Sequence, residues 1–338
     1  MSIPYTLKHL PQDFVVEELS LMPEQKKGPY SYWKLKKHNL TTLQAIQILS
    51  KATRIRLKDF GYAGNKDKKA ITTQLISVKT RYPDQLDRLQ KFQDPSMELT
   101  RSGSGNEHIR LGRLGGNHFD IIVRNLAHAP RVFTKIPNLF GPQRFSQNNA
   151  QIGRFIVKKQ FADAAKLMDD PAVQGFLAKH PDEPIAAIQC LPKRLMALYV
   201  HAYQSLLFNE MVHTYLKWHS LADVENVELP LIGFGMDEAV NQDVKRMVDA
   251  VLQKEVISER DFIIRQIPEL SAEGGSRSLF LEVKDLVVGE LEDDECFPEK
   301  KKCVLSFTLA KGCYATVVID FLFNTEPTVS EAEGCMCP

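Results

Sequence analysis

The hydrophobic pattern of the first hundred residues predicts a helix followed by a strand. Two threonines, Thr41 and Thr42, precede apolar residues at helical spacing up to Ala52, which is typical of a capped amphipathic helix. Glycines at 61–64 then break the helical pattern. The stretch 70–78 is short and β-branched, so we predict that it forms a strand.

Further strands are predicted near the middle and the end of the chain. Segments 118–123 and 304–309 have the residue types that pleated surfaces favour. Segment 315–322 is also apolar and rich in β-branched residues, and we expect it to pair with 304–309 across a turn at Gly312.

Between 147 and 285 the apolar residues instead recur at helical spacing. Strand-rich ends around a helix-rich middle predict an α+β protein, in which a sheet domain is interrupted by an inserted, mostly helical α/β domain. The expected parts are 1–149 and 286–328 for the sheet domain, 150–285 for the insertion, and 329–338 for a flexible tail.

Bulk properties narrow the class of protein. At 338 residues and 43% hydrophobic content the chain is long enough for two cores. We find no apolar run of membrane-spanning length and no signal peptide, so we expect a cytoplasmic protein. The six cysteines lack a paired framework, which favours free thiols, with Cys335 and Cys337 in the tail.

Charge is distributed unevenly along the chain, although the net charge is only +1. The first 150 residues contain 24 basic and 12 acidic residues, which leaves 19 basic and 30 acidic residues for 151–338. The two halves therefore carry net charges of +12 and −11. A basic half of this kind is typical of proteins that bind nucleic acid, and we expect binding that weakens steeply with salt.

Several common catalytic motifs are missing. No glycine is followed by lysine, which excludes a P-loop, and neither GxGxxG nor HExxH nor a zinc-spaced His/Cys set occurs. We therefore expect neither a metal nor a nucleotide cofactor.

The segment GYAGNKDKKAITTQ at 61–74 is the strongest candidate for chemistry. It places Asp67 among Lys66, Lys68 and Lys69 on a glycine-flanked loop. The lysines favour the ionised carboxylate, and the glycines allow a nucleotide backbone to approach closely. An aspartate that bonds its own turn is the more common use of such a residue, so the loop alone does not decide the question.

Two aromatic segments add to this picture. Phe14 lies in LPQDFVVEE at 10–18, and Asn138 and Phe140 lie in PNLFGPQRF at 137–145. An aromatic ring can stack on an unpaired base, and an amide can orient it. Core packing is the ordinary role of such phenylalanines and remains the alternative.

Six blocks, in this order along the chain, resemble the TruD family of tRNA pseudouridine synthases. The resemblance covers nearly the whole chain, and the two most specific blocks are the G-x-K-D loop and the N-x-F-G-x-Q-R-F segment. The blocks are DFVVEE at 13–18, GYAGNKDKKAITTQ at 61–74, LGRLGGNHFDIIVRN at 111–125, PNLFGPQRFS at 137–146, LMALYVHAYQSLLFNEMV at 195–212 and LAKGCYATVVIDFL at 309–322.

The resemblance implies a pseudouridine-synthase fold with a central mixed, largely antiparallel sheet flanked by helices. It implies conversion of a uridine in tRNA, usually at position 13, into pseudouridine by base flipping and without a cofactor. Asp67 matches the family's catalytic aspartate. The expected substrate-binding residues are Phe14, Asn138, Phe140, Lys8 and Lys66, and the expected RNA-binding residues are Lys68, Lys69 and Arg144.

Two other functions use the same features. A non-catalytic RNA-binding or tRNA-folding protein would use the basic half without needing Asp67. A methyltransferase would require a cofactor site, for which the sequence offers no motif. We expect a monomer that acts on tRNA.

Overall fold

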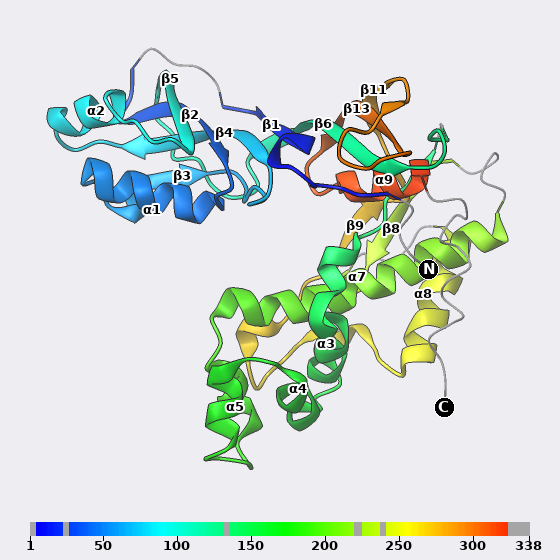
Figure 1. The fold of residues 1–338 in the computed structure, drawn as a ribbon. Helices are drawn as coiled ribbons and strands as arrows, with labels where there is room; N and C mark the ends of the chain where they lie inside the picture. Colours follow the sequence, from blue (N-terminus) through cyan, green and yellow to red (C-terminus); the bar gives the residue numbers. More distant parts are fainter. Residues whose placement is uncertain (1–4, 23–26, 132–134, 220–224, 237–240, 324–338) are drawn as a thin grey trace. The chain divides into compact units, whose positions relative to one another are not determined.

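A computed structural model describes residues 5–22, 27–131, 135–219, 225–236 and 241–323 (Figure 1). The described residues divide into two compact units, and each is treated by itself. The first unit is drawn from Met1–Val132, Glu282–Ala315 and Leu322–Asn324, and the second from Phe133–Leu281 and Thr316–Phe321. The expected boundaries at 150 and 286, as limits of folding domains, stay a prediction.

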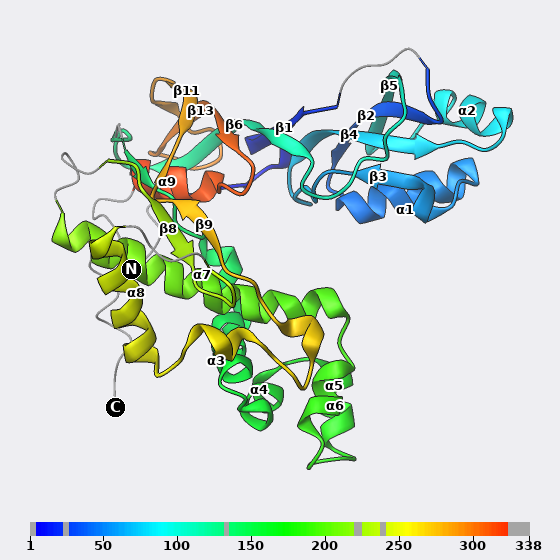
Figure 2. The ribbon, with the colours of Figure 1, turned by 180° about the vertical axis from the view of Figure 1, so that it is seen from behind.

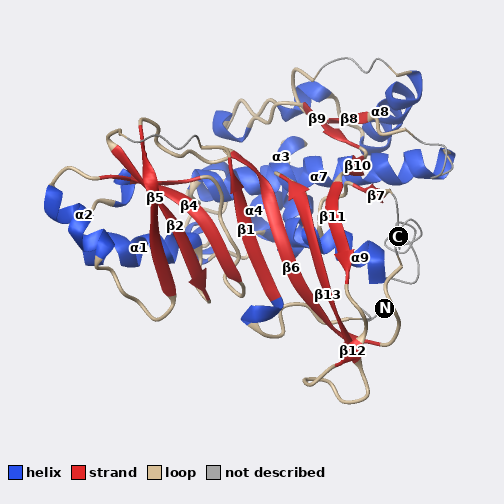
Figure 3. Ribbon diagram, turned by 90° about the horizontal axis from the view of Figure 1, so that it is seen from above, coloured by secondary structure: helices blue, strands red, loops and turns tan. Residues whose placement is uncertain are grey.

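The first unit is built on a nine-stranded sheet (Figure 3). Its strands follow the order β11-β13-β6-β1-β4-β2-β5, with β12 on β13 and β3 on β4. β1 pairs in parallel with β4, and the other pairings are antiparallel, so the sheet is mixed and largely antiparallel as predicted. The strands are β1 (Phe14–Ser20), β2 (Tyr30–His38), β3 (Phe60–Tyr62), β4 (Ile71–Lys79), β5 (Met97–Gly105), β6 (Leu114–Leu126), β11 (Val283–Val288), β12 (Glu292–Asp293) and β13 (Lys301–Ala310).

Helix α1 (Thr42–Thr53) covers one face of this sheet at β2 and β4, together with α2 (Pro83–Gln90). The predicted cap is present, because the Thr41 hydroxyl accepts a hydrogen bond from the Gln44 backbone amide. Apolar side chains of the helix face the sheet and bury a common core. The core includes Trp33, Leu35, Ala45, Ile46, Leu49, Ile76, Val78 and Leu89.

The second unit is mostly helical and is organised around the long helix α7 (Lys193–Trp218), seen from behind in Figure 2. Helix α3 (Asn149–Val157) packs closely on it, since a Cβ at Gly153 would lie 2.0 Å from the Tyr199 carbonyl oxygen. The remaining helices of this part are α4 (Phe161–Leu167), α5 (Pro171–Leu177), α6 (Pro184–Gln189) and α8 (Gln242–Glu255).

Two small antiparallel pairs complete the second unit. β8 (Glu228–Leu231) pairs with β9 (Gly275–Ser278), and β10 (Phe280–Leu281) pairs with β7 (Ile136–Pro137). In the second pair, β7 leads directly into the predicted Asn138–Phe140 segment.

The predicted hairpin at the end of the chain is wrong. Segment 315–322 lies in helix α9 (Ala315–Phe323), and β13 pairs with β6 and β11 instead. A short, mainly apolar run fits a buried helix as well as a buried strand, because its few polar residues are not enough to reveal a period. The predicted strands at 70–78, 118–123 and 304–309 and the helix at 41–52 are confirmed.

Within the described residues, no helix has the length and apolarity needed to cross a membrane. Cys190, Cys296 and Cys303 are free thiols. Cys335 and Cys337, with the expected tail, lie outside the described residues.

Candidate active site

Asp67 lies in the loop between β3 and β4 and presents its carboxylate at the surface of the first unit. Its side chain is 48% exposed, and its Oδ2 lies 2.6 Å from the Nζ of Lys8. The Lys8 side chain is only 18% exposed. Lys8 has φ of +54°, in the left-handed region that a residue with a Cβ occupies at a cost of about 1 kcal/mol. The chain thus accepts local strain where it presents this ammonium to the carboxylate.

Phe14 supports Lys8 from the sheet side. The Lys8 ammonium lies 4.2 Å from the centroid of the Phe14 ring, a cation–π contact. The ring itself is 3% exposed and packs edge-on against Phe119, which stacks on Phe307. Phe14 is therefore a buried support beneath the Lys8–Asp67 pair.

Hydrogen bonds to buried side chains fix the loop that carries Asp67. The backbone amide of Lys66 donates to the Thr42 hydroxyl at 2.9 Å. Thr42 in turn donates to the side-chain carbonyl of Gln74, whose amide donates to the Gly64 carbonyl. The loop is thus tied to α1 and β4 at Gly64 and Lys66, just before Asp67.

Lys66 points into the protein. Its Nζ lies 2.8 Å from Glu18 Oε2, in an ion pair whose two side chains are 7% and 1% exposed. The same ammonium donates to Asn117 Oδ1 at 2.6 Å. By contrast, Lys68 and Lys69 are exposed on the outer side of the loop. Of the three lysines, only these two are available to a large polyanion.

Asn138 and Phe140 belong to the second unit, where Arg277 of β9 joins them. Asn138 is 5% exposed, and its backbone amide donates to the Leu279 carbonyl at 2.8 Å. The Arg277 guanidinium donates to both the backbone and the side-chain carbonyl of Asn138. It also lies 4.3 Å from the Phe140 ring centroid. One cation therefore orients both the amide and the ring.

The main chain of Phe140 is held by Asn209 of α7. Asn209 accepts from the Phe140 amide at 2.9 Å and donates to the Phe140 carbonyl at 3.0 Å. The ring meets Phe208 edge-on, and the Arg144 guanidinium lies 5.8 Å from its centroid. All three predicted residues of this segment, Asn138, Phe140 and Arg144, thus belong to one cluster.

A cavity of about 360 Å³ opens beside Phe140 within the second unit. Its walls are largely apolar and aromatic, which suits a flat ring system. The lining residues are Leu139, Phe140, Pro142, Phe145, Asn209, His213, Val317, Asp320 and Phe321.

Comparison with known proteins identifies the family. The model of the family described as tRNA pseudouridine synthase D (TruD) matches residues 2–171, 171–226 and 220–320. The chain belongs to the TruD family.

Curated relatives agree with this membership. The tRNA pseudouridine synthase D of Aquifex aeolicus is 27% identical, with 95% of this chain and 98% of that protein covered. The protein of the same name from Syntrophotalea carbinolica is 28% identical, with 95% and 96% covered. A solved structure from Methanosarcina mazei that carries the TruD name has the same fold, with a TM-score of 0.75 at 24% identity over 97% of this chain and 95% of that one.

Three polar residues that hold the candidate site of this TruD protein were not predicted from its sequence. Arg277 follows two glycines in a polar stretch that gives no periodic signal, and Asn209 lies inside a long helix. Lys37 donates a hydrogen bond to the backbone carbonyl of Asp67. The sequence did contain a signal for Lys37. The residue continues the alternating positions of Trp33 and Leu35 on β2, and this pattern places a lysine on the buried face of the strand.

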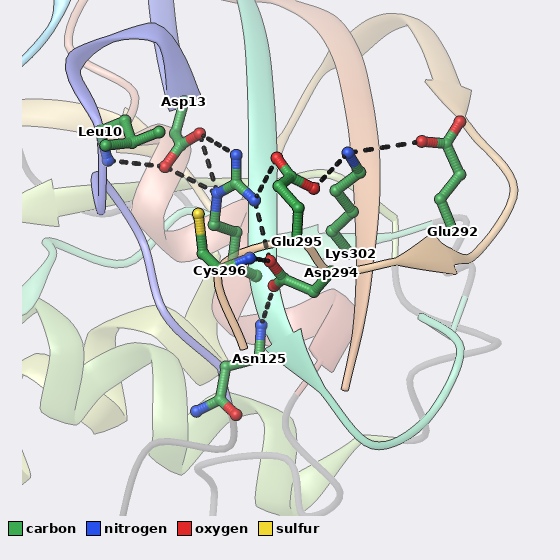
Figure 4. Close-up of polar contacts among 9 residues, drawn as sticks. Leu10, Asp13, Asn125, Glu292, Asp294, Glu295, Cys296 and Lys302 are labelled. Atoms are coloured by element: carbon green, nitrogen blue, oxygen red, sulfur yellow. Dashed lines mark hydrogen bonds and ion pairs between the residues drawn. The ribbon is translucent and has the colours of Figure 1, made fainter. Parts of the chain in front are cut away.

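A buried ion network holds the segment that carries Lys8 and Phe14 (Figure 4). Arg124 of β6, 3% exposed in its side chain, pairs with Asp13 at 2.9 Å and with Asp294 at 2.9 Å. Asp13 also accepts from the Leu10 backbone amide at 2.8 Å. The turn 10–13 between Lys8 and Phe14 is thereby fastened to the sheet.

The pKa values in this network are shifted so that each group stays charged: that of the arginine is raised, and those of the carboxyl groups Asp294 and Glu295 are lowered. The hydrogen bonds that Arg124 donates, first to Asp13 and then to Glu295 and Asp294, raise its pKa. Burial pushes the pKa of Asp294 upward, but the amides of Asn125 and Cys296 together with Arg124 outweigh it, so that this pKa is lowered. The hydrogen bond from Lys302 is the largest cause that lowers the pKa of Glu295 to about 2.

Metal ligation finds no support in the described part of the chain. No group of three or more His, Cys, Asp or Glu side chains there is arranged to hold a metal ion.

Proposed function

We propose that Asp67 is the catalytic carboxylate with which this chain converts a uridine of tRNA, at position 13, into pseudouridine. As a member of the TruD family the chain is a tRNA pseudouridine synthase, an isomerase. The observation that carries the assignment of Asp67 is its half-exposed carboxylate, held at 2.6 Å by Lys8 on a loop fixed by buried hydrogen bonds.

The isomerisation breaks the bond between N1 of uracil and C1′ of ribose and forms a bond between C5 and C1′. The proton on C5 is lost and N1 gains one, so the reaction needs no oxidant or reductant. A carboxylate can attack C1′, add to C6 of the base, or remove the proton at C2′. Each route requires an ionised oxygen that reaches the nucleotide.

Lys8 is the residue that prepares this oxygen. It binds Oδ2 of Asp67, so we assign Oδ1 as the reacting atom. Lys8 in turn cannot move away freely, because its ammonium rests on the buried Phe14 ring. Preorganisation of this kind lowers the reaction barrier, since no side chain must be ordered at the moment of reaction.

We assign the Asn138–Phe140 cluster to binding of the extruded base. Arg277 and Asn209 hold the amide and the ring in fixed orientations, and a nucleobase fits within the volume of the neighbouring cavity. Aromatic stacking offsets part of the few kcal/mol that flipping costs. The exposed Lys68 and Lys69, with Arg144, are assigned to the RNA backbone.

The test is tritium release from tRNA that carries uridine labelled at C5, because forming the C5–C1′ bond expels that hydrogen. Wild-type protein should release tritium, and mapping should place pseudouridine at position 13. Asp67→Asn should bind tRNA but release none. Asp84→Asn, which changes an exposed aspartate of α2 in the same unit, is the matched control and should retain activity. Binding without release by the wild type would instead support a tRNA-binding protein.

We further propose that the enzyme acts in the cytoplasm as a monomer. Gel filtration with light scattering tests the second proposal.

A further inference from the structure

Lys37 is a buried cation without a direct counter-ion. It lies on β2 and is 1% exposed. Among the described residues, no carboxylate oxygen lies within the 4.0 Å of its Nζ that would make an ion pair. Its two hydrogen-bond acceptors are uncharged backbone carbonyls, those of Leu40 at 2.6 Å and Asp67 at 2.9 Å.

Burial of Lys37 without an anion lowers the free energy of unfolding when it is considered by itself. Burying an ammonium is costly unless an anion pairs with it. Trp33 and Leu35 precede Lys37 at alternate positions of β2 and are buried in the core beneath α1, so an apolar residue would continue the pattern. The acceptor Leu40 immediately precedes the cap of α1, and the positive end of a helix is unfavourable for a cation.

The positions of its two carbonyl acceptors show what Lys37 contributes to the structure. Leu40 belongs to the turn between β2 and α1, and Asp67 to the loop between β3 and β4. Lys37 therefore joins two loops that are distant in sequence, and one of its bonds is to the main chain of Asp67 itself. Thr42 holds the same loop at the main chain of Lys66, Lys8 binds the Asp67 carboxylate, and Lys37 binds the Asp67 main chain.

We propose that Lys37 is a positioning residue for pseudouridylation, which fixes the Asp67 main chain by a charged hydrogen bond and supplies positive potential to its carboxylate. This inference rests on the proposed function of Asp67. It adds to Lys8 a second cation that acts from inside the protein and touches no substrate.

The surroundings of Lys37 make its charge titratable. Burial lowers its pKa to about 8, the attraction of Asp67 opposes this shift, and the repulsion of Lys66 adds to it. Its cross-strand neighbours, Thr72 of β4 and Met97 of β5, are neutral. Glu18 of β1 is engaged by Lys66. Loss of the Lys37 proton should therefore reduce the rate on the alkaline side, with an inflection near pH 8.

The experiment measures single-turnover tritium release from tRNA between pH 6 and pH 10, with Lys37→Met compared against Leu35→Ala. Both residues are buried on β2, but Leu35 packs in the core beneath α1 and controls for loss of core packing. We expect Lys37→Met to lower the rate by roughly 10²-fold, the effect of misplacing a catalytic group by about 1 Å. Its tRNA Kd should stay at the wild-type value, and the inflection near pH 8 should vanish.

Leu35→Ala should lower the melting temperature and keep both the rate of the folded protein and the inflection. Wild-type rate and wild-type pH profile in Lys37→Met would overturn the proposal, as would an equal loss of rate in Leu35→Ala. If Lys37→Met does not fold, Lys37→Gln, which keeps an N–H donor without the charge, carries the same comparison. Turnover by Asp67→Asn at the wild-type rate would instead refute the proposed function, whatever Lys37 does.

Discussion

Replacing Arg124 by methionine tests how the turn between Lys8 and Phe14 is held. Methionine is similar in length and removes the charge without opening a large cavity. It would leave Asp13 and Asp294, whose side chains are 1% and 0% exposed, without their cation. Breaking a buried pair from one side costs about 3–5 kcal/mol, because an uncompensated charge stays buried.

The structure limits the loss of unfolding free energy expected for Arg124→Met. Asp294 keeps the backbone amides of Asn125 and Cys296, and Asp13 keeps that of Leu10, which reduces the loss. Glu295, the third partner of Arg124, is 57% exposed, so its share is under about 1 kcal/mol. We therefore expect the lower part of the range, about 3 kcal/mol.

Urea unfolding of the wild type and of Arg124→Met at several pH values measures the effect. In the wild type the lowered pKa of Asp294 stabilises the fold above the unfolded pKa of about 3.9, and this contribution is lost as the pH falls through the folded pKa. In Arg124→Met, burial without the cation should raise the carboxyl pKa values. The difference in unfolding free energy should thus be largest at pH 7 and shrink toward pH 4.

Arg113→Met provides the control, because Arg113 is 47% exposed and pairs with the exposed Glu107. Its loss should stay below about 1 kcal/mol at every pH. Arg124→Met should also lose tritium release at temperatures where it remains folded, since the turn that sets Lys8 is loosened. A loss no larger than that of Arg113→Met, or one independent of pH, would refute the reasoning.

Three further changes test the assignments to RNA and base. Reversing Lys68 and Lys69 to glutamate should weaken tRNA binding and reduce the slope of log K against log salt by about 2, measured by filter binding; an unchanged slope would mean that they face solvent only. Phe140→Ala should abolish most tritium release with the circular dichroism spectrum intact, whereas unfolding would assign the ring to packing. Arg277→Met should lower kcat more than it raises the tRNA Kd, because it frees Asn138, and an effect on Kd alone would contradict this role.

The sequence allowed α1 and three strands of the sheet, β4, β6 and β13, to be predicted because their signals are local. Thr41 caps α1 by accepting a hydrogen bond from Gln44, only three positions away. The β-branched residues of β4 favour a strand by their own conformational propensity. Segment 315–322 lacks such a local signal. Its apolar, β-branched residues favour a strand by propensity, and tertiary packing decides for the helix α9.

The candidate site was predicted in part for a related reason. Asp67, Asn138 and Phe140 lie in blocks that resemble the TruD family, and the resemblance also implies a basic residue at Lys8. The direction in which Lys66 points was not predictable, since its partners Glu18 and Asn117 come from β1 and β6 and meet it only after the sheet forms. Arg277 was not predicted for the same reason: its partner Asn138 is 139 residues away in the sequence and meets it only in the folded protein.

The Arg124 network also has a consequence for the order in which a newly made chain folds. Asp13 leaves the ribosome early, whereas Asp294 and the β13 strand that flanks β6 are made only after segment Phe133–Leu281 of the second unit. Until then one edge of β6 lacks its partner strand, and the turn that positions Lys8 lacks part of its anchor. Catalytic competence should therefore arise late in synthesis, and an interrupted chain that ends before about residue 282 would carry Asp67 without the Asp294 part of the anchor that positions Lys8.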